Sequence, residues 1–166
     1  MFIPVEVVGV RIEMPSNQPI LLLKEIEGSK FLPIWIGSNE ANAIAFAQQG
    51  LNPSRPLTHD LISDLLDRTG VILTAVHITS LEDGIFYAEL ILRNETSPLE
   101  PLSCRPSDAV AIALRCKSNI LVDLDLLESA GIEIPEGIIP GESGEGLDEV
   151  EAFREFLDQI NPEDFA

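Results

Sequence analysis

Residues 105–115 have the sequence Arg-Pro-Ser-Asp-Ala-Val-Ala-Ile-Ala-Leu-Arg, and this segment guides the interpretation of the whole chain. Proline has a backbone φ that suits the first turn of a helix. Ser107 and Asp108 carry oxygen atoms that accept hydrogen bonds from the free N–H groups of that turn. The rest of the segment is rich in alanine, which loses no side-chain entropy in a helix. The segment therefore predicts a helix whose small side chains permit close packing.

An earlier segment repeats this pattern. Residues 40–46, Glu-Ala-Asn-Ala-Ile-Ala-Phe, match residues 108–114, Asp-Ala-Val-Ala-Ile-Ala-Leu, at an offset of 68 residues. Each copy follows a run of residues that is typical of a strand and a turn. We interpret the match as a duplicated unit of β-hairpin, strand and helix. The alternative is that two alanine-rich helices arose independently, because tight packing selects small residues.

The composition is that of one globular, strongly acidic domain. The chain has 166 residues, of which 45% are hydrophobic. Its formal net charge of −18 consists of −8 in residues 142–166 and −10 in residues 1–141. A protein that grips nucleic acid mainly through phosphates carries a stripe of Lys and Arg, which this sequence lacks. The acidity instead leaves room for a divalent cation, since carboxylates bind such ions.

Two further features bear on the location of the protein. The sequence contains no apolar run of membrane-spanning length, and its N-terminus lacks the charged region of a signal peptide. Cys104 and Cys116 do not have the spacing of a CxxC motif or the density of a disulfide scaffold. We therefore expect a cytoplasmic protein without membrane contacts, in which both cysteines are reduced and half-buried thiols.

Hydrophobic periodicity predicts an α+β fold with largely antiparallel sheets, built from the two related β-hairpin/strand/helix units. Between the units we expect a helix from Thr58 to Asp67, with a buried stripe formed by Leu61, Leu65 and Leu66. The only tryptophan, Trp35, is expected to anchor the core.

The chain divides into a main domain over residues 1–133, a Pro/Gly-rich linker over 134–146, and an acidic C-terminal helix and tail over 147–166. Apolar residues recur in the tail at helical spacing. An isolated helix of this length is marginal in water. We therefore expect the tail helix to dock on its own domain, on another subunit or on a protein partner. The residues of this stripe are Leu147, Val150, Phe153, Leu157 and Ile160.

Candidate functional side chains lie at the predicted element ends. An acidic residue begins each of three helices, and two arginines precede prolines, which holds them in extended backbone. If the helix N-termini converge on one cleft, carboxylates could hold Mg²⁺ or Mn²⁺ while arginines bind a phosphate. The alternative is structural: the acids serve as helix-dipole partners, His59 is a structural histidine, and Arg105 pairs with Asp108. The residues concerned are Glu40, Arg55, His59, Asp60, Arg105 and Asp108.

Three motifs together resemble the bifunctional nuclease (BFN) family and its bacterial members. They are Leu-Pro-Ile-Trp-Ile-Gly at residues 32–37 with Glu40-Ala41, Arg-Pro-Leu-Thr-His-Asp-Leu at residues 55–61, and the segment at residues 105–115. The resemblance covers residues 1–133, which makes that part a BFN-like domain. It implies a compact α+β domain, often oligomeric, with nuclease activity on RNA and DNA in some members.

The resemblance also implies roles for the matching residues. His59, Asp60 and Asp108 would be catalytic, Arg55, Arg105 and Ser107 would bind substrate, and Asp60, Asp108 and Glu40 would bind a metal. The expected function is that of a metal-dependent nuclease that uses Mg²⁺ or Mn²⁺ and no organic cofactor, acts on RNA or DNA, and forms a homo-oligomer. The alternative is a non-catalytic oligomeric protein-interaction module with an acidic surface.

Overall fold

The computed structural model describes residues 1–135. The predicted tail helix and all but the first two residues of the predicted linker lie outside this range. In the described part, no helix is long and apolar enough to cross a membrane. Because the described residues end at residue 135, the predicted boundary between the domain and the linker stays a prediction.

One mixed, mostly antiparallel sheet of eight strands forms the framework, in the order β6-β5-β4-β7-β1-β2-β3-β8. Its only parallel pair among the described residues is β4 with β7. The α+β class is thereby confirmed, with one continuous sheet. The strands are β1 (Phe2–Glu13), β2 (Gln18–Glu25), β3 (Lys30–Trp35), β4 (Ile72–Glu82), β5 (Ile85–Arg93), β6 (Leu102–Cys104), β7 (Asn119–Asp123) and β8 (Ile132–Glu133).

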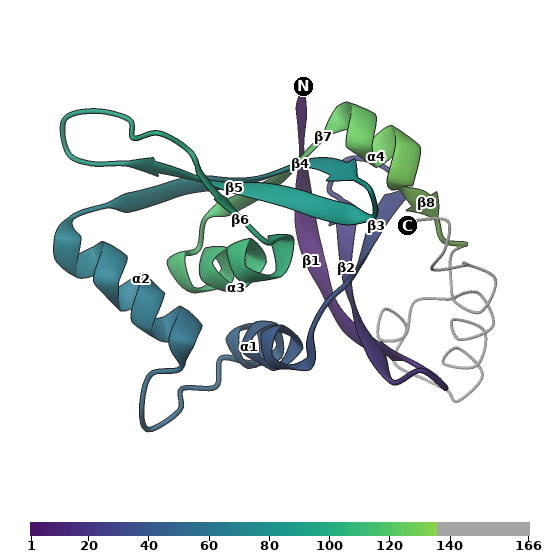
Figure 1. Cartoon of the computed structure of the whole chain (residues 1–166), viewed down its shortest axis with the longest axis horizontal. Coiled ribbons are helices and arrows are strands. Elements are labelled where there is room, and N and C mark those ends of the chain that lie inside the picture. Colours follow the sequence, from purple (N-terminus) through teal and green to yellow (C-terminus); the bar gives the residue numbers. More distant parts are fainter. Residues whose placement is uncertain (136–166) are drawn as a thin grey trace.

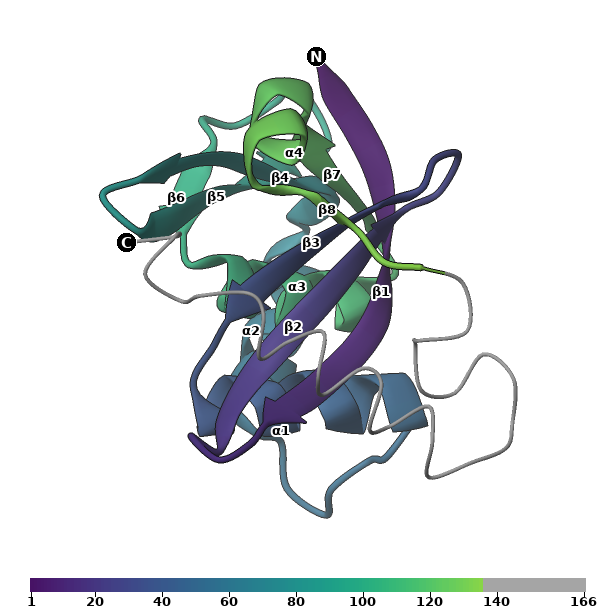
Figure 2. The ribbon, with the colours of Figure 1, turned by 90° about the vertical axis from the view of Figure 1, so that its right-hand side faces the viewer.

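Four helices pack on this sheet: α1 (Ser38–Gln49), α2 (Thr58–Thr69), α3 (Pro106–Cys116) and α4 (Leu124–Ala130). Three of them, α1, α2 and α3, lie together on one side, whereas α4 lies apart near β3 and β7 (Figure 1). The helix α3 is central, because it contacts α1, α2, β4, β5 and β7. Figure 2 shows α1 and α3 starting on the same side of the molecule.

The topology supports the proposed duplication. Each unit is a three-stranded antiparallel meander followed by a helix, β1-β2-β3-α1 in the first unit and β4-β5-β6-α3 in the second. The helix α2 lies between the two units in the sequence. The two meanders lie on either side of β7, which pairs antiparallel with β1 and parallel with β4. Within the described residues, the two units therefore meet in the sheet only through β7.

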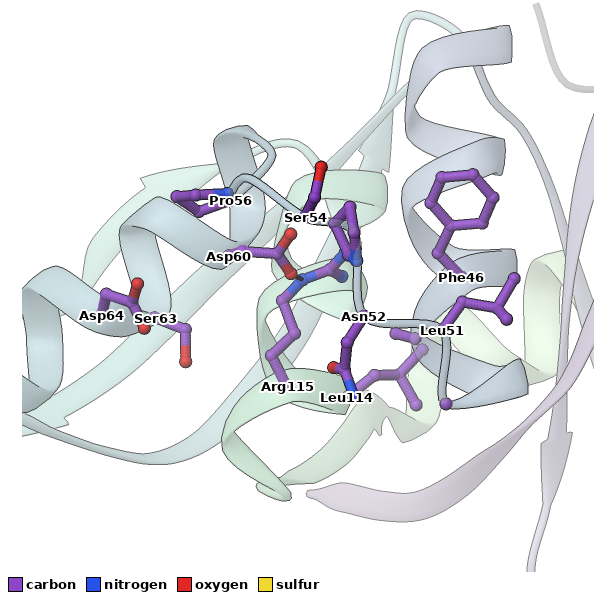
Figure 3. A pocket seen from close by; sticks show the side chains of 13 residues that line it. Phe46, Leu51, Asn52, Ser54, Pro56, Asp60, Ser63, Asp64, Leu114 and Arg115 are labelled. Atoms are coloured by element: carbon purple, nitrogen blue, oxygen red, sulfur yellow. Dashed lines mark hydrogen bonds and ion pairs between the residues drawn. The ribbon is translucent and has the colours of Figure 1, made fainter.

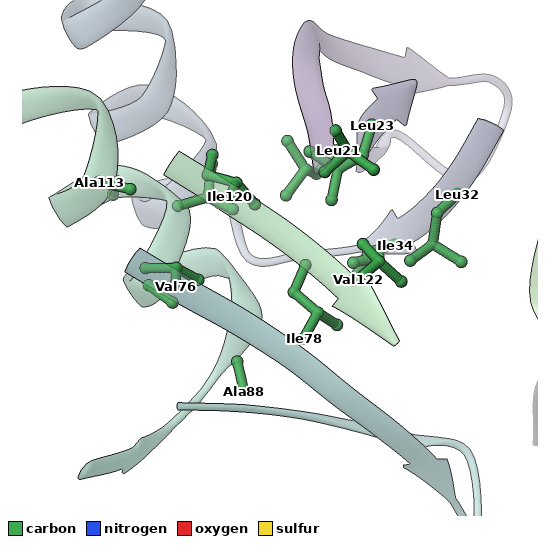
Figure 4. Close-up of a cluster of buried hydrophobic side chains, with 14 of the residues drawn as sticks. Leu21, Leu23, Leu32, Ile34, Val76, Ile78, Ala88, Ala113, Ile120 and Val122 are labelled. Carbon is green, nitrogen blue, oxygen red and sulfur yellow. The ribbon is translucent and has the colours of Figure 1, made fainter. Parts of the chain in front are cut away.

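Alanine allows α3 to lie deep in the core. Ala109, Ala111 and Ala113 are each 0% exposed, so the helix backbone approaches its neighbours closely. Around it the two meanders contribute aliphatic side chains to one cluster (Figure 4). Because the interior is close-packed, added volume at these positions is poorly tolerated. Members of the cluster include Leu21, Leu23, Leu32, Ile34, Val76, Ile78, Ala88, Ile120 and Val122.

Two predictions about single elements were wrong. Leu61 and Leu65 of α2 are each 59% exposed, and only Leu66 of that stripe packs against the core. The reason is that α2 contacts the rest of the domain mainly through α3, and the residue that it buries there is His59. Trp35 is half-buried rather than an anchor of the main core, and it packs beside a smaller cluster that contains Ile20 and Leu22.

The close packing of α3 gives a direct test. Replacing Ala113 by leucine should destabilise the fold by about 1–3 kcal/mol, because the added methyl groups have no space beside the cluster. Ala45 occupies the equivalent position of the first unit and is only half-buried, so Ala45→Leu should cost clearly less. Urea unfolding of both variants measures the difference. Equal losses would show that α3 is not packed more tightly than α1.

Candidate functional site

Arg105 organises the start of α3. It is the N-cap residue, held in an extended conformation before Pro106, with φ −73° and ψ 145°. From there its guanidinium reaches back to the first turn, where Nε donates to Oδ2 of Asp108 at 2.7 Å and Nη2 donates to Oδ1 at 3.1 Å. These hydrogen bonds raise the pKa of Arg105. The local geometry of Arg-Pro-Ser-Asp therefore produces a bidentate ion pair.

The same guanidinium joins the beginnings of two helices. Nη2 of Arg105 also donates to Oε1 of Glu40, in the first turn of α1, at 2.8 Å. The Arg105 side chain is 65% exposed, whereas that of Glu40 is 16% exposed. The acids that begin the two related helices thus share one arginine, which confirms that these two helix beginnings converge.

His59 completes this group from α2. Its Nε2 lies 2.9 Å from Oδ1 of Asp108, and the residue is buried. Burial opposes ionisation of Asp108, but hydrogen bonds from Arg105 and His59 outweigh it and lower the pKa of the carboxyl group. Because Asp108 is a carboxylate and accepts hydrogen bonds only, Nε2 of His59 is the donor. We call Glu40, His59, Arg105 and Asp108 the four-residue cluster.

Asp60 lies outside this cluster, although it follows His59 in sequence. Its Oδ1 accepts from Nε of Arg115 at 2.6 Å, and its Oδ2 accepts from the backbone N–H of Leu57 at 2.9 Å. Burial raises the pKa of Asp60, but these hydrogen bonds prevail and lower it. The Arg115 side chain is only 9% exposed and also donates to the backbone oxygens of Ala43 and Ala111. Asp60 and Arg115 therefore tie α2 to α3 and α1.

This ion pair lines an open pocket of about 410 Å³ between α1, α2 and the end of α3. In Figure 3 the Asp60 and Arg115 side chains point toward one another, with Ser63 and Asp64 on the α2 side and Phe46 and Leu51 on the other. Two of the predicted catalytic residues, Asp60 and Asp108, thus belong to different ion-pair groups.

The remaining predicted residues have different surroundings. Ser107 is 5% exposed and lies directly beside the four-residue cluster in the first turn of α3. Arg55 is exposed in the connector before α2 and takes part in no ion pair within residues 1–135. The structure therefore brings Glu40, His59, Arg105, Ser107 and Asp108 together, but not Arg55.

Comparison with known proteins assigns the family. The bifunctional nuclease domain matches residues 21–135. The chain belongs to the bifunctional nuclease domain family. An uncharacterized protein of Mycobacterium tuberculosis is 50% identical over 167 residues, which cover 97% of this chain and 96% of that protein.

Plant members of the family are more distant. Bifunctional nuclease 2 of Oryza sativa subsp. japonica is 30% identical over 131 residues, which cover 77% of this chain and 40% of the rice protein. Bifunctional nuclease 1 of Arabidopsis thaliana is 28% identical over 138 residues, which cover 80% of this chain and 42% of the plant protein. The similarity therefore spans less than half the length of these plant relatives.

The bifunctional nuclease resemblance implied a metal site, and the geometry permits a test of fit. Both carboxylate oxygens of Asp108 and of Asp60 accept hydrogen bonds, and Arg105 places a positive charge between Asp108 and Glu40. Within residues 1–135, no group of three or more His, Cys, Asp or Glu side chains is placed to hold a metal ion. The predicted ligands do not fit a metal centre in this arrangement, and the requirement for Mg²⁺ or Mn²⁺ stays a prediction.

Sequence reasoning missed the partner of Asp60. Arg115 pairs with an acid 55 residues earlier in the chain. No local pattern reveals such a pair, although an arginine that ends an alanine-rich, buried helix needs a carboxylate or carbonyl partner nearby. The cysteines match the prediction, since both are free and half-buried. Burial, together with the charges of Asp108 and Glu89, raises the pKa of Cys104 to about 11, so its thiol is a poor nucleophile at neutral pH.

The lowered pKa of Asp60 makes part of the stability depend on pH. A carboxyl group whose pKa is lower in the folded state stabilises the fold above its unfolded value of about 3.9, and this stabilisation is lost as the pH falls through the folded value. Asp60→Asn should therefore cost about 1–3 kcal/mol at pH 7, because the buried Arg115 loses its charged partner, and less below pH 4. Urea unfolding of the wild type and of Asp60→Asn, at pH 7 and below pH 4, measures the loss of stability at each pH.

Asp67 provides the matched control on the same helix. It is exposed and forms no ion pair in the described part of the chain, so Asp67→Asn should change the stability by less than about 0.5 kcal/mol. A constant penalty for Asp60→Asn at all pH values would contradict a contribution from the ionised carboxylate.

Proposed function

We propose that the chain is a nuclease that hydrolyses phosphodiester bonds in RNA or DNA, with the four-residue cluster as its reactive centre. The observation that carries the proposal is the hydrogen bond of 2.9 Å between His59 and Asp108, beside an exposed arginine at the start of a helix. Membership of the bifunctional nuclease domain family and the names of the plant relatives support it.

The histidine–aspartate pair has the arrangement of a general base. With Nε2 of His59 donating to Asp108, the neutral ring carries its lone pair on Nδ1. When a water molecule attacks the phosphorus, the P–O bond to the leaving oxygen breaks. Nδ1 would accept the proton that the water gives up, and the leaving oxygen would take a proton from solvent. Asp108 would hold the ring in this tautomer and stabilise the imidazolium that forms. In this proposal Asp108 positions and stabilises His59, while His59 moves the proton.

Arg105 supplies the positive charge that the transition state needs. Its Nε and Nη2 bind Asp108 and Glu40, which leaves Nη1 without a hydrogen bond among the described residues. A guanidinium fixed by two carboxylates presents the two N–H groups of Nη1 in a defined direction, so little entropy is lost when it binds a phosphate oxygen. Glu40 would position Arg105 without touching the substrate.

The test is cleavage of single-stranded RNA and DNA oligonucleotides by the purified chain. We expect His59→Gln to lower the rate by about 10²- to 10⁴-fold, the usual contribution of a general base, and Asp108→Ala to abolish most activity. Asp67→Asn, the exposed control on α2, should leave the rate unchanged. Residual activity that is equal in the wild type and in Asp108→Ala would indicate a copurified nuclease and would contradict the proposal.

Parallel reactions with EDTA, Mg²⁺, Mn²⁺ or Ca²⁺ test the predicted metal dependence separately. Activity that disappears in EDTA and returns with one cation would support a metal-dependent nuclease, in which the substrate supplies ligands that residues 1–135 do not provide by themselves. Activity that persists in EDTA would support proton transfer by His59 alone.

A second candidate function is supported by the surface of α2. Leu57, Leu61 and Leu65 are 38%, 59% and 59% exposed and recur at intervals of four residues, which aligns them on one face of the helix. Exposed apolar patches commonly mark protein–protein contacts. This face would serve the alternative role of a non-catalytic oligomeric interaction module.

Replacing both Leu61 and Leu65 by serine tests this role. If the α2 face carries an interface, the double variant should have a lower mass in light scattering after gel filtration, with an unchanged urea midpoint, because neither side chain belongs to the core. A chain truncated at Gly141 separates this interface from any contact made by the tail. An unchanged mass in both variants would exclude each surface as the oligomer contact.

A further inference from the structure

A second pocket is lined by Arg105 of the four-residue cluster and does not include the ion pair of Asp60 and Arg115. It has a volume of about 490 Å³, within the range of about 300–1,000 Å³ that small-molecule sites occupy. Four parts of the chain line it: the turn and first residues of β2, the end of β3 with the start of α1, the β4–β5 turn, and the start of α3. The lining includes Asn17, Trp35, Ser38, Ile85, Arg105 and Ser107.

Two helix beginnings open into this pocket. Gly37 and Ser38 belong to the start of α1, and Arg105 to Ser107 belong to the start of α3. The first turn of each helix also holds an acid, Glu40 in α1 and Asp108 in α3, and both acids bind Arg105. The first N–H groups of a helix carry a partial positive charge and bind anions. Two such helix starts facing one space favour a phosphate there.

The side chain of Ser107 provides independent evidence for a ligand. Ser107 is 5% exposed and lines the pocket, yet its Oγ forms no hydrogen bond within residues 1–135. The Oγ atom itself is not among the fully buried polar atoms of these residues, so a group bound in the pocket can reach it. Nη1 of Arg105, in the same lining, also has no partner among the described residues. Arg105 and Ser107 therefore contribute two hydrogen-bond donors to the lining of this pocket.

The remaining wall is apolar and partly aromatic. Trp35, Ile36, Ile85 and Phe86 line it, and Ile85 is 57% exposed at the β4–β5 turn. Asn17 and Gln18 add side-chain amides at the rim. A flat ring with polar edges suits such a wall, because nucleobases stack on aromatic side chains and bond with amides. The pocket thus has one part that suits an anion and an adjoining part that suits a flat aromatic ring.

The charge of the whole chain limits what can bind. With a formal net charge of −18, the protein repels a long polyanion over most of its surface. Arg105, which also binds Glu40 and Asp108, is the only charged residue in the lining of this pocket. A single nucleotide can bind this guanidinium, whereas a long strand brings many phosphates toward a protein of negative net charge.

We propose that this pocket binds a single nucleotide, with its phosphate at the converging starts of α1 and α3, bonded by Ser107 and Arg105, and its base against the wall formed with Trp35. The substrates of the proposed nuclease would then be short oligonucleotides or strand ends rather than the interior of long strands. The choice of substrate rests on the proposed function, but nucleotide binding does not, and binding is measured without cleavage.

Trp35 is the only tryptophan, so its fluorescence reports on this pocket alone. We would titrate the full chain with AMP, with adenosine and with inorganic phosphate. The fluorescence should change with AMP at concentrations at least about tenfold lower than with adenosine or phosphate, because only AMP occupies both parts. Ser107→Ala should weaken AMP binding about three- to tenfold, the effect of one neutral hydrogen bond. Ser54→Ala, in the other pocket, is the matched control and should bind as the wild type does.

The stability of Ser107→Ala separates a binding role from a structural one. Since its hydroxyl has no partner in the described residues, the urea midpoint should not fall, whereas a structural role would lower it. Identical binding by Ser107→Ala and Ser54→Ala, or equal responses to AMP and phosphate, would overturn the proposal. AMP binding that depends on Ser107, together with no cleavage of any oligonucleotide, would support the nucleotide pocket and contradict the nuclease.

Discussion

The close approach of α1 and α3 is the constraint on which the site depends. Alanines on both helices permit it, and Ala109, Ala111 and Ala113 are fully buried. Larger side chains would separate the helix starts and break the shared contacts of Arg105 with Glu40 and Asp108. Packing in the core therefore sets the geometry of the charges at the surface. In the repeated motif, the alanines bring the helices close together and the acids bind the shared arginine.

Electrostatics then explains how an acidic protein can present an anion site. The acids that begin α1 and α3 would repel a phosphate if they were free, but both bind the guanidinium of Arg105, and Asp108 also binds His59. The single positive charge of Arg105 thereby compensates part of their two negative charges, while the acidic residues elsewhere remain. The pair of Asp60 and Arg115 has another role, since it fixes α2 against α3 and so holds His59 in place. Position within the fold, rather than residue type, separates these two aspartates.

The sequence predicts features that depend on neighbours in the chain. The proline and acid before the alanines locate the start of α3, and the repeat at an offset of 68 residues anticipates two similar meanders with helices. The convergence of the helix starts was a condition of the predicted site, and the structure supplies it through the contacts of Arg105 with Glu40 and Asp108.

Features that depend on distant contacts were not predictable in this way. The periodicity of α2 indicates an apolar face but not which side of the helix the body covers, so Leu61 and Leu65 were assigned to the core although they face outward. Likewise the sequence neighbours His59 and Asp60 point to different partners, because successive residues on a helix lie about 100° apart. Only the placement of α2 against α3 decides which of them joins Asp108.

The position of β7 has a consequence for biosynthesis. This strand lies between the two meanders, pairing with β1 on one side and β4 on the other, yet it is synthesised after both. Until residues 119–123 leave the ribosome, β1 and β4 each keep an open edge, and such edges invite pairing with other chains. The first half of a nascent chain therefore cannot complete its strand pairing until the second half is made. During that interval the negative charge of the chain helps to keep neighbouring chains apart.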